Sequence, residues 1–539
     1  MSTTFLRGPA LKDPGSGLLD RSRPGAGPGL HAPWPAGSAS RVWLDAAFIP
    51  LLMLGASLLF RGIGFTVAVI DTDEGLYLVQ AREWLRGGWP LVAVWDMHPI
   101  GAPALYAAAI GLFGESIATI RMLGIACVAA AGWALYGLGR AGGLARPVAA
   151  AAGVLYIAHT VLLFGLASNT EVLFAPFVVA SLAIGLRAAI RALEDGRAPG
   201  WGELAGMGLL MGVAFCIKPV VTPEGCLAFA LLTFPALWRR LLPVPRFLGM
   251  AAAYAGLVLT PMASFALAYL AQGDLAEFLD GSLLAPIRYA EARLSLPEAA
   301  QRVQVALMVL LWPMLLAGLA LARWGLRRGR GGRLARIALL WFACGSLAII
   351  GPGFFYPHYF LIWMPPMALL AAMGAWRLAG LVRPRHGMAV FVALVALVAA
   401  EAWRQEATVR VGRGHGIWTP DPVAEVAKAV RARIHPGDPI FVANYHPVIY
   451  AMARAAAPTR FVFPAHLTGG FTQVADIDTN EELRRVLATK PKLVVVDRGW
   501  WWQLRPSAAA ILTEALARDF VLDGTVAEER GPVELWRPR

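Results

Sequence analysis

Four acidic residues and a histidine lie close to the first long apolar stretches of the chain. Asp71, Asp73 and Glu74 follow the first of these stretches, and Asp96 and His98 directly precede the second. A carboxylate can act as a general base toward a hydroxyl nucleophile, and a histidine can bind an anion or carry a proton. Acidic residues are also common in the first turn of a helix, where they cap it. Capping does not explain why Asp96 and His98 recur at the next apolar segment, so this loop is a candidate catalytic loop.

The residues between these acidic groups predict a helix. Tyr77, Leu78, Trp84 and Leu85 have helical spacing, so residues 75–86 are expected to form an amphipathic helix that lies on the membrane surface. The acidic groups would then stand at a membrane boundary.

Long apolar stretches dominate the chain up to about residue 403. Of the 539 residues, 58% are hydrophobic and only 15% are charged, whereas a soluble globular protein has about 45–50% and about 25%. A hydrocarbon core of about 30 Å requires roughly 20 helical residues. The candidate spans are residues 43–63, 99–114, 118–139, 147–166, 170–190, 202–218, 224–238, 247–271, 303–325, 336–352, 357–376 and 387–403. We therefore predict a polytopic α-helical membrane protein.

The formal net charge of +13 comes from arginines that cluster in the loops between apolar stretches. Such an excess is typical of the cytoplasmic loops of membrane proteins, so we do not interpret it as a nucleic-acid-binding surface. The clusters at residues 239–246, 323–336 and 377–385 are separated by even numbers of crossings and fit one side of the membrane.

The segment 99–114 conflicts with this orientation if it crosses the membrane. It is short and contains Pro99 and Pro103, so it is expected not to cross fully. The prediction is an odd number of crossings, about 11–13. Loop 64–98 and the C-terminal part would then lie on the side opposite the arginines.

The two ends of the chain differ from the apolar part. Residues 1–42, rich in Gly, Pro, Ser and Arg, predict a disordered cytoplasmic tail before the membrane domain of residues 43–403. Residues 404–539 alternate between strand-like and helical patterns, which predicts a small α/β domain outside the cytoplasm. The strand-like runs are 439–443 and 492–497, and the helical ones are 421–434 and 480–488.

Several short motifs follow one another in a definite order. In the candidate catalytic loop they are Asp73-Glu74-Gly75-x-Tyr77, Ala81-Arg82-Glu83, Gly88-Trp89, Asp96-x-His98-Pro99 and Pro103-x-Leu105-Tyr106. Further along are Ala118-Thr-Ile-Arg121, Ser168-Asn-Thr-Glu171, the glycine-rich run 206–218 that ends in Lys218, and Phe355-Tyr-Pro-His358-Tyr359-Phe360. This ordered set resembles GT-C glycosyltransferases over about residues 43–403. The chain is similar to bacterial relatives of protein O-mannosyltransferases and of lipid A aminoarabinose transferase.

The resemblance implies a GT-C membrane fold and a transferase activity. Members of the family pass a sugar from a polyprenyl phosphate to an acceptor outside the cytoplasmic membrane. The expected partners are a polyprenyl-phosphate sugar, the lipid bilayer and an acceptor that is lipid A, a glycan, another lipid or a protein. The expected location is the bacterial cytoplasmic (inner) membrane, with the active site and the C-terminal domain on the periplasmic side.

The resemblance also implies roles for the acidic residues. Asp73 is the candidate general base of a single-displacement, inverting transfer, which needs no enzyme nucleophile. Glu74 would orient the acceptor or cap the helix. Asp96 would be a second acidic contact or the partner of a cation.

The leaving phosphate needs cationic or hydrogen-bonding partners. The candidates are His98, Arg82, Lys218, His358 and Tyr359. Lys218 could equally extend to the membrane interface, Arg82 could bind lipid headgroups, and Tyr359 fits packing or an aromatic belt at least as well.

The chain departs from its relatives at two of these positions. Many relatives have Glu-Lys-Pro-Pro where this chain has Asp96-Met-His98-Pro99, so His98 would replace a lysine as a phosphate partner. Relatives also often carry an arginine just before the late tyrosine, where this chain has Tyr356 and His358.

Glu171 and Arg121 are further candidates, either for the site or as partners of each other and of loop charges. No His/Cys cluster has zinc-ligand spacing, and no metal or other cofactor is assigned. A divalent cation held by Asp73, Glu74 and Asp96 is the one metal site that the sequence would allow.

Three other functions fit the composition, and one of them is a polysaccharide polymerase or ligase, which also uses lipid-linked substrates but has a different fold. A transporter or flippase of lipid-linked saccharides would also need a bundle with few charges, but it would favour inverted repeats and midplane charges, which the sequence lacks. A scaffold would bind a partner through its soluble domain. In that domain, Tyr445 and the run Trp500, Trp501 and Trp502 could stack on sugars, although core packing or membrane contact is the more common role of such a run.

Overall fold

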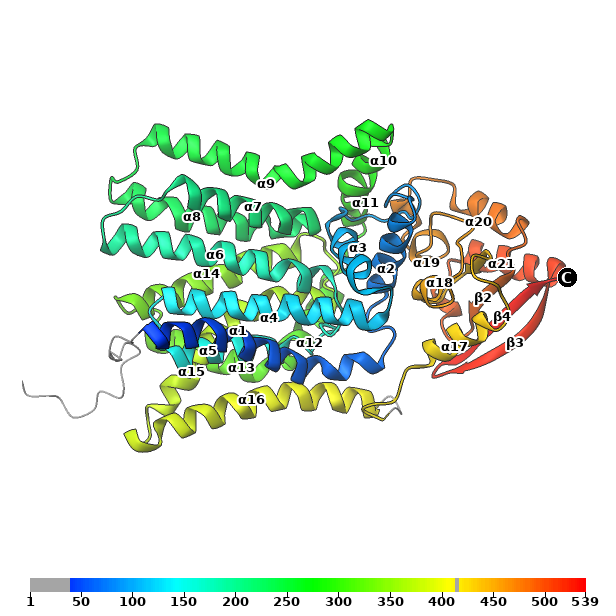
Figure 1. The fold of residues 1–539 in the computed structure, drawn as a ribbon. Coiled ribbons are helices and arrows are strands. Elements are labelled where there is room, and N and C mark those ends of the chain that lie inside the picture. Colours follow the sequence, from blue (N-terminus) through cyan, green and yellow to red (C-terminus); the bar gives the residue numbers. More distant parts are fainter. Residues whose placement is uncertain (1–38, 413–415) are drawn as a thin grey trace, which may run out of the picture.

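Long helices form a bundle, and a small mixed domain covers one end of it (Figure 1). The computed structural model describes residues 39–412 and 416–539. The first helix, α1, begins at Ala39, so the predicted tail of residues 1–42 lies almost entirely outside the described residues. The polytopic helical fold with a C-terminal α/β domain is confirmed.

Within the residues that the structure describes, eight helical segments are long and apolar enough to cross a membrane. They contain α1 (Ala39–Arg61), α4 (Ile117–Ala141), α6 (Thr170–Glu194), α8 (Thr222–Trp238), α9 (Val244–Gln272), α14 (Arg330–Ile350), α15 (Met364–Ala379) and α16 (Pro384–Gly412). The pair α12 (Leu296–Val309) and α13 (Leu311–Trp324) is bent by 80°, which fits either a broken span or a re-entrant segment.

Two shorter helices, α5 (Arg146–His159) and α7 (Trp201–Ile217), also traverse the bundle. The start of α6 returns to the start of α4, where Ser168 Oγ donates to Ile120 O at 2.6 Å. Since α4 leads away from this point, α5 and the loop after it must lead back. With α5, α7 and the bent pair added to the eight, eleven segments of the described residues run between the two ends of the bundle. Only eight of these, or nine with the bent pair, are long and apolar enough to cross a membrane, so the predicted 11–13 crossings stay a prediction.

The segment predicted not to cross does remain at one end. It forms α3 (Gly101–Phe113). The end of α1 and the start of α4 are neighbours, because a Cβ on Gly124 of α4 would lie 3.1 Å from Arg61 Nη2. The chain between them, including α3, therefore leaves and returns at the same end.

The predicted arginine clusters gather at the opposite end. Glu194, at the end of α6, pairs with Arg330 and Arg333, and Arg191 pairs with Glu203 at the start of α7. We call this the arginine end, and we call the end under the C-terminal domain the domain end.

The helix predicted on the membrane surface is instead enclosed by protein. It is α2 (Thr72–Leu85), and all its residues from Glu74 to Arg82 are buried. It packs against α3 and against α18 (Val448–Met452) of the C-terminal domain. Short helices beside it at the domain end are α10 (Leu275–Leu279), α11 (Ala285–Glu291) and the 3-10 helix η4 (Pro357–Trp363).

The last long helix, α16, continues to Gly412, beyond the predicted end at residue 403. Its final turns are not apolar, so hydropathy does not reveal them. Ion pairs at helical spacing hold them together, between Glu401 and Arg404 and between Glu406 and Arg410.

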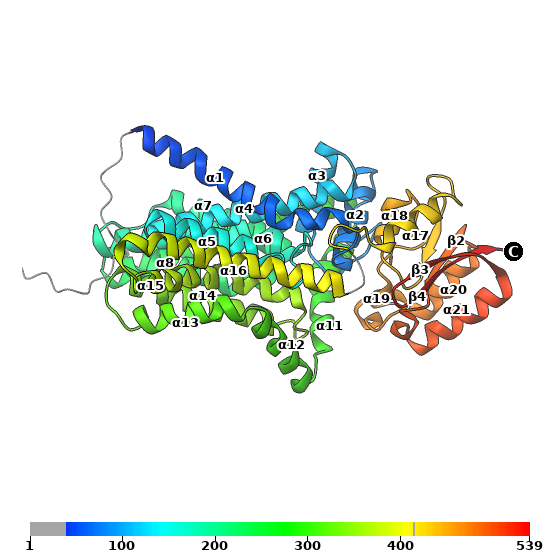
Figure 2. The same cartoon turned by 90° about the horizontal axis from the view of Figure 1, so that it is seen from below.

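The C-terminal domain is a four-stranded sheet covered by helices (Figure 2). The sheet order is β1-β2-β4-β3, with β1 parallel to β2 and the other pairs antiparallel. Both predicted strands and both predicted helices are present, and the final hairpin β3–β4 completes the sheet. The elements are α17 (Pro422–Arg431), β1 (Ile440–Val442), α18, α19 (Pro464–Leu467), α20 (Thr479–Ala488), β2 (Leu493–Asp497), α21 (Pro506–Asp519), β3 (Phe520–Glu528) and β4 (Gly531–Pro538).

The domain is joined to the bundle by direct backbone contacts. The Trp95 N–H donates to Arg460 O at 2.8 Å, and the Val69 N–H donates to Asp421 Oδ2 at 3.0 Å. At Gly75 a Cβ would lie 2.8 Å from the backbone nitrogen of Val448, so only glycine allows this approach of α2 to α18. These contacts fix the domain over the loop of residues 64–98, which we call the acidic loop.

Candidate active site

A cavity of about 700 Å³ lies between the domain end of the bundle and the C-terminal domain. Its bundle side carries the acidic loop and the cations that the sequence singled out. Its other side consists of domain loops. The bundle-side residues include Asp71, Asp73, His98, Lys218, Tyr289, Tyr356, His358 and Tyr359.

Asp71 begins α2 and fixes a histidine beside it. Its carboxylate accepts from the Asp73 backbone N–H at 3.2 Å and from Asn169 Nδ2 at 3.0 Å. His358 Nδ1 lies 2.9 Å from Asp71 Oδ2. Burial raises the pKa of Asp71, but the charge and hydrogen bond of His358 outweigh burial and lower it to about 2. Asp71 is therefore a helix cap and a charged partner of His358.

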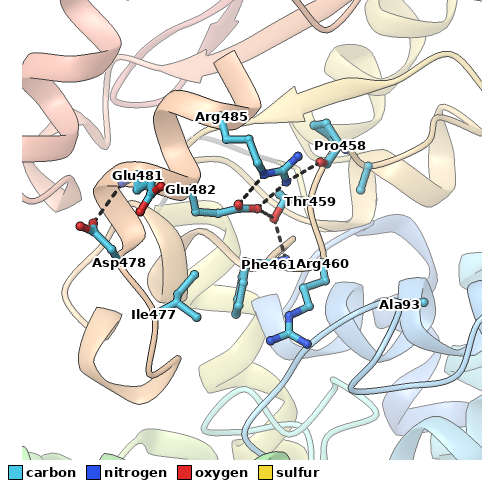
Figure 3. Close-up of a pocket in the computed structure, with 11 residues that line it drawn as sticks. Ala93, Pro458, Thr459, Arg460, Phe461, Ile477, Asp478, Glu481, Glu482 and Arg485 are labelled. Atoms are coloured by element: carbon cyan, nitrogen blue, oxygen red, sulfur yellow. Dashed lines mark hydrogen bonds and ion pairs between the residues drawn. The ribbon is translucent and has the colours of Figure 1, made fainter. Parts of the chain in front are cut away.

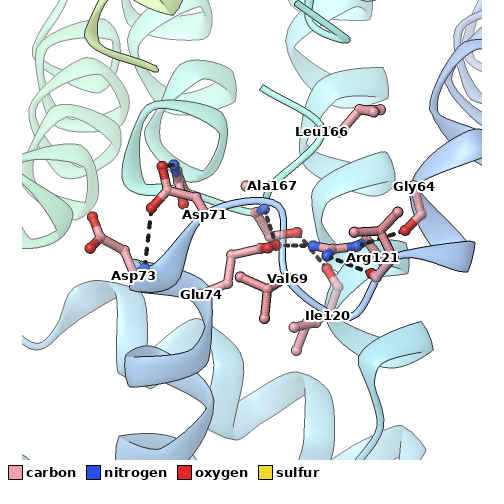
Figure 4. Close-up of polar contacts among 12 residues, drawn as sticks. Gly64, Val69, Asp71, Asp73, Glu74, Ile120, Arg121, Leu166 and Ala167 are labelled. Atoms are coloured by element: carbon pink, nitrogen blue, oxygen red, sulfur yellow. Dashed lines mark hydrogen bonds and ion pairs between the residues drawn. The ribbon is translucent and has the colours of Figure 1, made fainter. Parts of the chain in front are cut away.

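Asp73 is the carboxylate that the cavity leaves available. It lines the cavity, and among the described residues its carboxylate has no hydrogen-bond partner (Figure 4). Burial and then the charge of Asp71 raise its pKa to about 7, against the opposing effects of His358 and His98. A carboxylate with a pKa near neutrality is suited to accept a proton.

Three cation-capable side chains surround Asp73 in the cavity lining. Lys218 Nζ donates to Glu171 Oε1 at 2.7 Å and lies 4.4 Å from the centre of the Tyr359 ring. An ammonium group has three donors, so the pair with Glu171 leaves others free to meet an anion. His358 and His98 complete the group. We call Asp71, Asp73, His98, Lys218 and His358 the cavity cluster.

Glu74, predicted as catalytic, lies outside the cavity lining. Its side chain is 2% exposed and pairs with Arg121, and Glu74 Oε1 also accepts from the Ser168 N–H at 2.7 Å (Figure 4). Arg121 in turn donates to Gly64 O and Val67 O, each at 3.1 Å. This pair joins α2, α4 and the loop before α6, so its geometry is that of a structural link.

Asp96 and Arg82 are also turned away from the cavity. Asp96 Oδ1 accepts from the Met97 N–H at 2.7 Å, and Asp96 Oδ2 lies 3.1 Å from His98 Nδ1, so Asp96 orients a cavity histidine. Arg82 donates to Tyr450 O in α18. The structure thus brings Arg82 to the domain interface and not to the other phosphate candidates.

The remaining predictions concern Glu171, Arg121 and a divalent cation. Glu171 pairs with Lys218 and not with Arg121. The three carboxylates proposed for a cation do not converge, because Glu74 faces Arg121 and Asp96 faces His98. Their donor set therefore does not fit one metal ion.

The domain side of the cavity contains residues that sequence reasoning missed or left open. His466, whose side chain is 1% exposed, lines the cavity, and neither of its ring nitrogens has a hydrogen-bond partner in the described part of the chain. Trp500, Trp502 and Gln503 also line it. The tryptophan run was the only sequence signal for this wall, and nothing near His466 marked it.

A second pocket of about 710 Å³ lies on the domain beside the acidic loop (Figure 3). Its main polar groups are already paired: Arg485 Nε donates to Glu482 Oε2 at 2.6 Å, and Thr459 Oγ1 donates to Glu482 Oε1 at 2.6 Å. Of the acidic loop it includes only Ala93. More of the reactive side chains converge on the first cavity, so that cavity is the candidate active site.

A family model matches part of the chain, and solved structures resemble its fold. Residues 97–265 match the model of the dolichyl-phosphate-mannose-protein mannosyltransferase family. This segment includes His98, Glu171 and Lys218 but begins after Asp73. No curated protein sequence matches the chain.

Solved structures resemble the whole fold. ArnT from Cupriavidus metallidurans bound to undecaprenyl phosphate is similar with a TM-score of 0.60 and 15% identity, over 93% of this chain and 98% of that chain. The apo state of the same ArnT gives a TM-score of 0.55 at 15% identity over the same shares. The oligosaccharyltransferase AglB from Archaeoglobus fulgidus, in complex with an inhibitory peptide and a dolichol-phosphate, gives 0.50 and 13% over 91% of this chain and 74% of that chain.

Proposed function

We propose that the chain is a GT-C glycosyltransferase that transfers a sugar from a polyprenyl-phosphate donor to an acceptor outside the cytoplasm. The match of residues 97–265 to the mannosyltransferase family model and the likeness of the fold to ArnT and AglB support this proposal. The protein would reside in the bacterial inner membrane with its cavity on the periplasmic side, because the arginine end fits the cytoplasm. The ArnT structure bound to undecaprenyl phosphate supports a lipid-phosphate donor.

The observation that carries the proposal is the placement of Asp73. It is a cavity carboxylate without a partner among the described residues, and cation-capable side chains surround it. As general base it takes the proton of the acceptor hydroxyl while the oxygen attacks the anomeric carbon. The bond between that carbon and the phosphate oxygen breaks in the same displacement. One displacement inverts the anomeric configuration.

The leaving group departs as a polyprenyl phosphate, which gains negative charge as the bond breaks. Lys218 and His358 are the groups that would stabilise that charge, with His98 in the place where relatives have a lysine. Tyr359 would hold Lys218 through the ring contact at 4.4 Å. Arg82 has no part in this step because it donates to Tyr450 O.

The test is sugar transfer by the full-length chain in proteoliposomes. A panel of tritiated undecaprenyl-phosphate hexoses and pentoses is supplied with a cell-envelope extract as acceptor, and label in the acceptor is measured. For the donor that reacts, Asp73→Asn is expected to lower the rate by about 10²–10⁴-fold, the usual contribution of a general base. Binding of undecaprenyl phosphate should be kept.

A matched control is Asp274→Asn. Asp274 lies at the same end of the bundle, directly after α9, and does not line the cavity. Its variant should transfer at the native rate. Label that crosses the vesicle membrane on the donor without ever reaching an acceptor would instead establish the flippase. Transfer that survives in Asp73→Asn would remove Asp73 as the base.

A further inference from the structure

The cavity has two unlike walls. The bundle wall carries the cavity cluster, with its carboxylates and cations. The domain wall carries aromatic rings and uncharged polar groups, among them Phe463, Phe471, Trp500, Trp502 and Gln503. The bundle wall is accounted for by the proposed donor chemistry. The domain wall has no role in that chemistry, so its residues are free to contact the acceptor.

The tryptophan run divides between the cavity and the domain core. Trp500 and Trp502 line the cavity, and their ring centres are 5.5 Å apart. The guanidinium of Arg530 lies 4.3 Å from the centre of the Trp500 ring. Trp502 is 68% exposed, so most of its ring is free to contact a ligand. Trp501 lies outside the cavity lining, packs against the hydrophobic core and carries Arg498 at 4.4 Å from its ring.

Paired rings beside uncharged hydrogen-bonding groups suit a saccharide. The C–H groups of a pyranose face are weakly positive and pack on the negative face of an aromatic ring. The amide of Gln503 offers both donors and an acceptor to hydroxyl groups. Burial lowers the pKa of His466 to about 4, so at neutral pH its imidazole also has one donor and one acceptor.

We propose that the acceptor hydroxyl belongs to a saccharide whose ring lies against Trp500 and Trp502, on the domain wall opposite Asp73. This deepens the proposed function and rests on it. The acceptor sugar would enter between the walls and present its hydroxyl to Asp73. The donor phosphate would remain on the bundle wall beside Lys218 and His358.

A peptide acceptor fits this wall less well. Extended peptides are commonly bound along the edge of a sheet, where backbone groups pair. None of the described residues of β1, β2, β3 or β4 lines the cavity, whose domain side consists of loops and short helices. The wall therefore offers ring faces but no strand edge.

The experiment measures acceptor use by the full-length chain in proteoliposomes, with the labelled donor that reacts in the panel above. Two acceptors are compared: the delipidated polysaccharide and lipopolysaccharide fraction of the envelope, and a serine- and threonine-rich peptide. Label is expected in the saccharide fraction, resistant to protease. Trp502→Ala should raise the KM for that fraction by roughly tenfold, the value of an aromatic contact of about 1.4 kcal/mol.

Matched variants separate stacking from other roles. Trp502→Phe keeps a ring and should recover most of the affinity, and Trp501→Ala should leave the acceptor KM within about twofold. The donor KM and the melting temperature of Trp502→Ala should equal those of the native chain. Label in the peptide, or an acceptor KM that Trp502→Ala does not change, would overturn the saccharide platform while leaving the transferase intact. Absence of transfer from every donor would instead refute the proposed function.

Discussion

Asp73 of the cavity cluster and Glu74 of the Glu74–Arg121 pair are adjacent residues of α2, but their side chains have opposite surroundings. Asp73 faces an open cavity without a hydrogen-bond partner among the described residues. Glu74 is closed in by Arg121 and the Ser168 N–H. Consecutive residues of an α-helix point about 100° apart, so one residue of sequence separates a reactive position from a structural one. Residue type alone therefore does not identify a base, whereas the direction of the side chain and the partners it meets do.

The largest effect that would sharpen this comparison is the loss of stability expected when Glu74 is replaced. Glu74→Gln removes one partner of a buried ion pair and leaves the Arg121 charge uncompensated, which costs about 3–5 kcal/mol. The free energy of unfolding should fall accordingly in detergent, as followed by thermal melting. The protein that remains folded should transfer sugar at close to the native rate.

A catalytic Glu74 would give the reverse pattern, with native melting and lost transfer.

Asp73→Asn is the companion variant. Burial raises the pKa of Asp73 above its unfolded value, so its ionised form destabilises the fold as pH rises toward 7. The neutral amide should therefore melt at pH 8 at the native temperature or slightly higher.

A smaller effect is expected in donor binding at Lys218. Lys218→Gln removes a charged hydrogen-bond donor from the phosphate side, and such bonds contribute about 1.5–3 kcal/mol. The donor KM should rise by roughly 10–150-fold, measured with the reactive donor at saturating acceptor. The acceptor KM should stay near its native value.

The single variant also leaves Glu171 buried without its cation. The double variant Glu171→Gln, Lys218→Gln removes both charges and should restore stability but not donor affinity. If donor affinity returns in the double variant, Lys218 serves only to neutralise Glu171.

The smallest effect is expected at Arg82. Arg82→Ala removes the hydrogen bond to Tyr450 O and should speed amide hydrogen exchange in α18, with little change in donor KM. Arg86→Ala is the control, because Arg86 is exposed and its side chain pairs, among the described residues, with Glu83 one turn earlier. A raised donor KM with unchanged amide hydrogen exchange would instead indicate that Arg82 binds the donor phosphate.

The sequence predicted the fold well because hydropathy and arginine clusters report directly on membrane helices. It also identified 99–114 as a segment that does not cross, from its length and its two prolines. It placed the end of the last helix too early, because the final turns of α16 are held by ion pairs and not by apolar residues.

The site was only partly accessible to the same reasoning. Asp73 and His98 were found because they flank apolar segments. Arg82 was assigned to the phosphate because nothing in its local sequence reveals that α18, more than 360 residues away, supplies its partner. On the domain wall the sequence raised the tryptophan run but missed His466, because these residues share a cavity with Asp73 only through the docking of one domain on another.

The pH dependence of transfer tests most directly whether Asp73 is the base. The kcat/KM for the acceptor reports the ionisation of the free enzyme, and the pKa of Asp73 is raised to about 7. We predict that kcat/KM falls about tenfold per pH unit below an apparent pKa near 7. A rate that stays constant from pH 8 down to pH 5 would contradict the account.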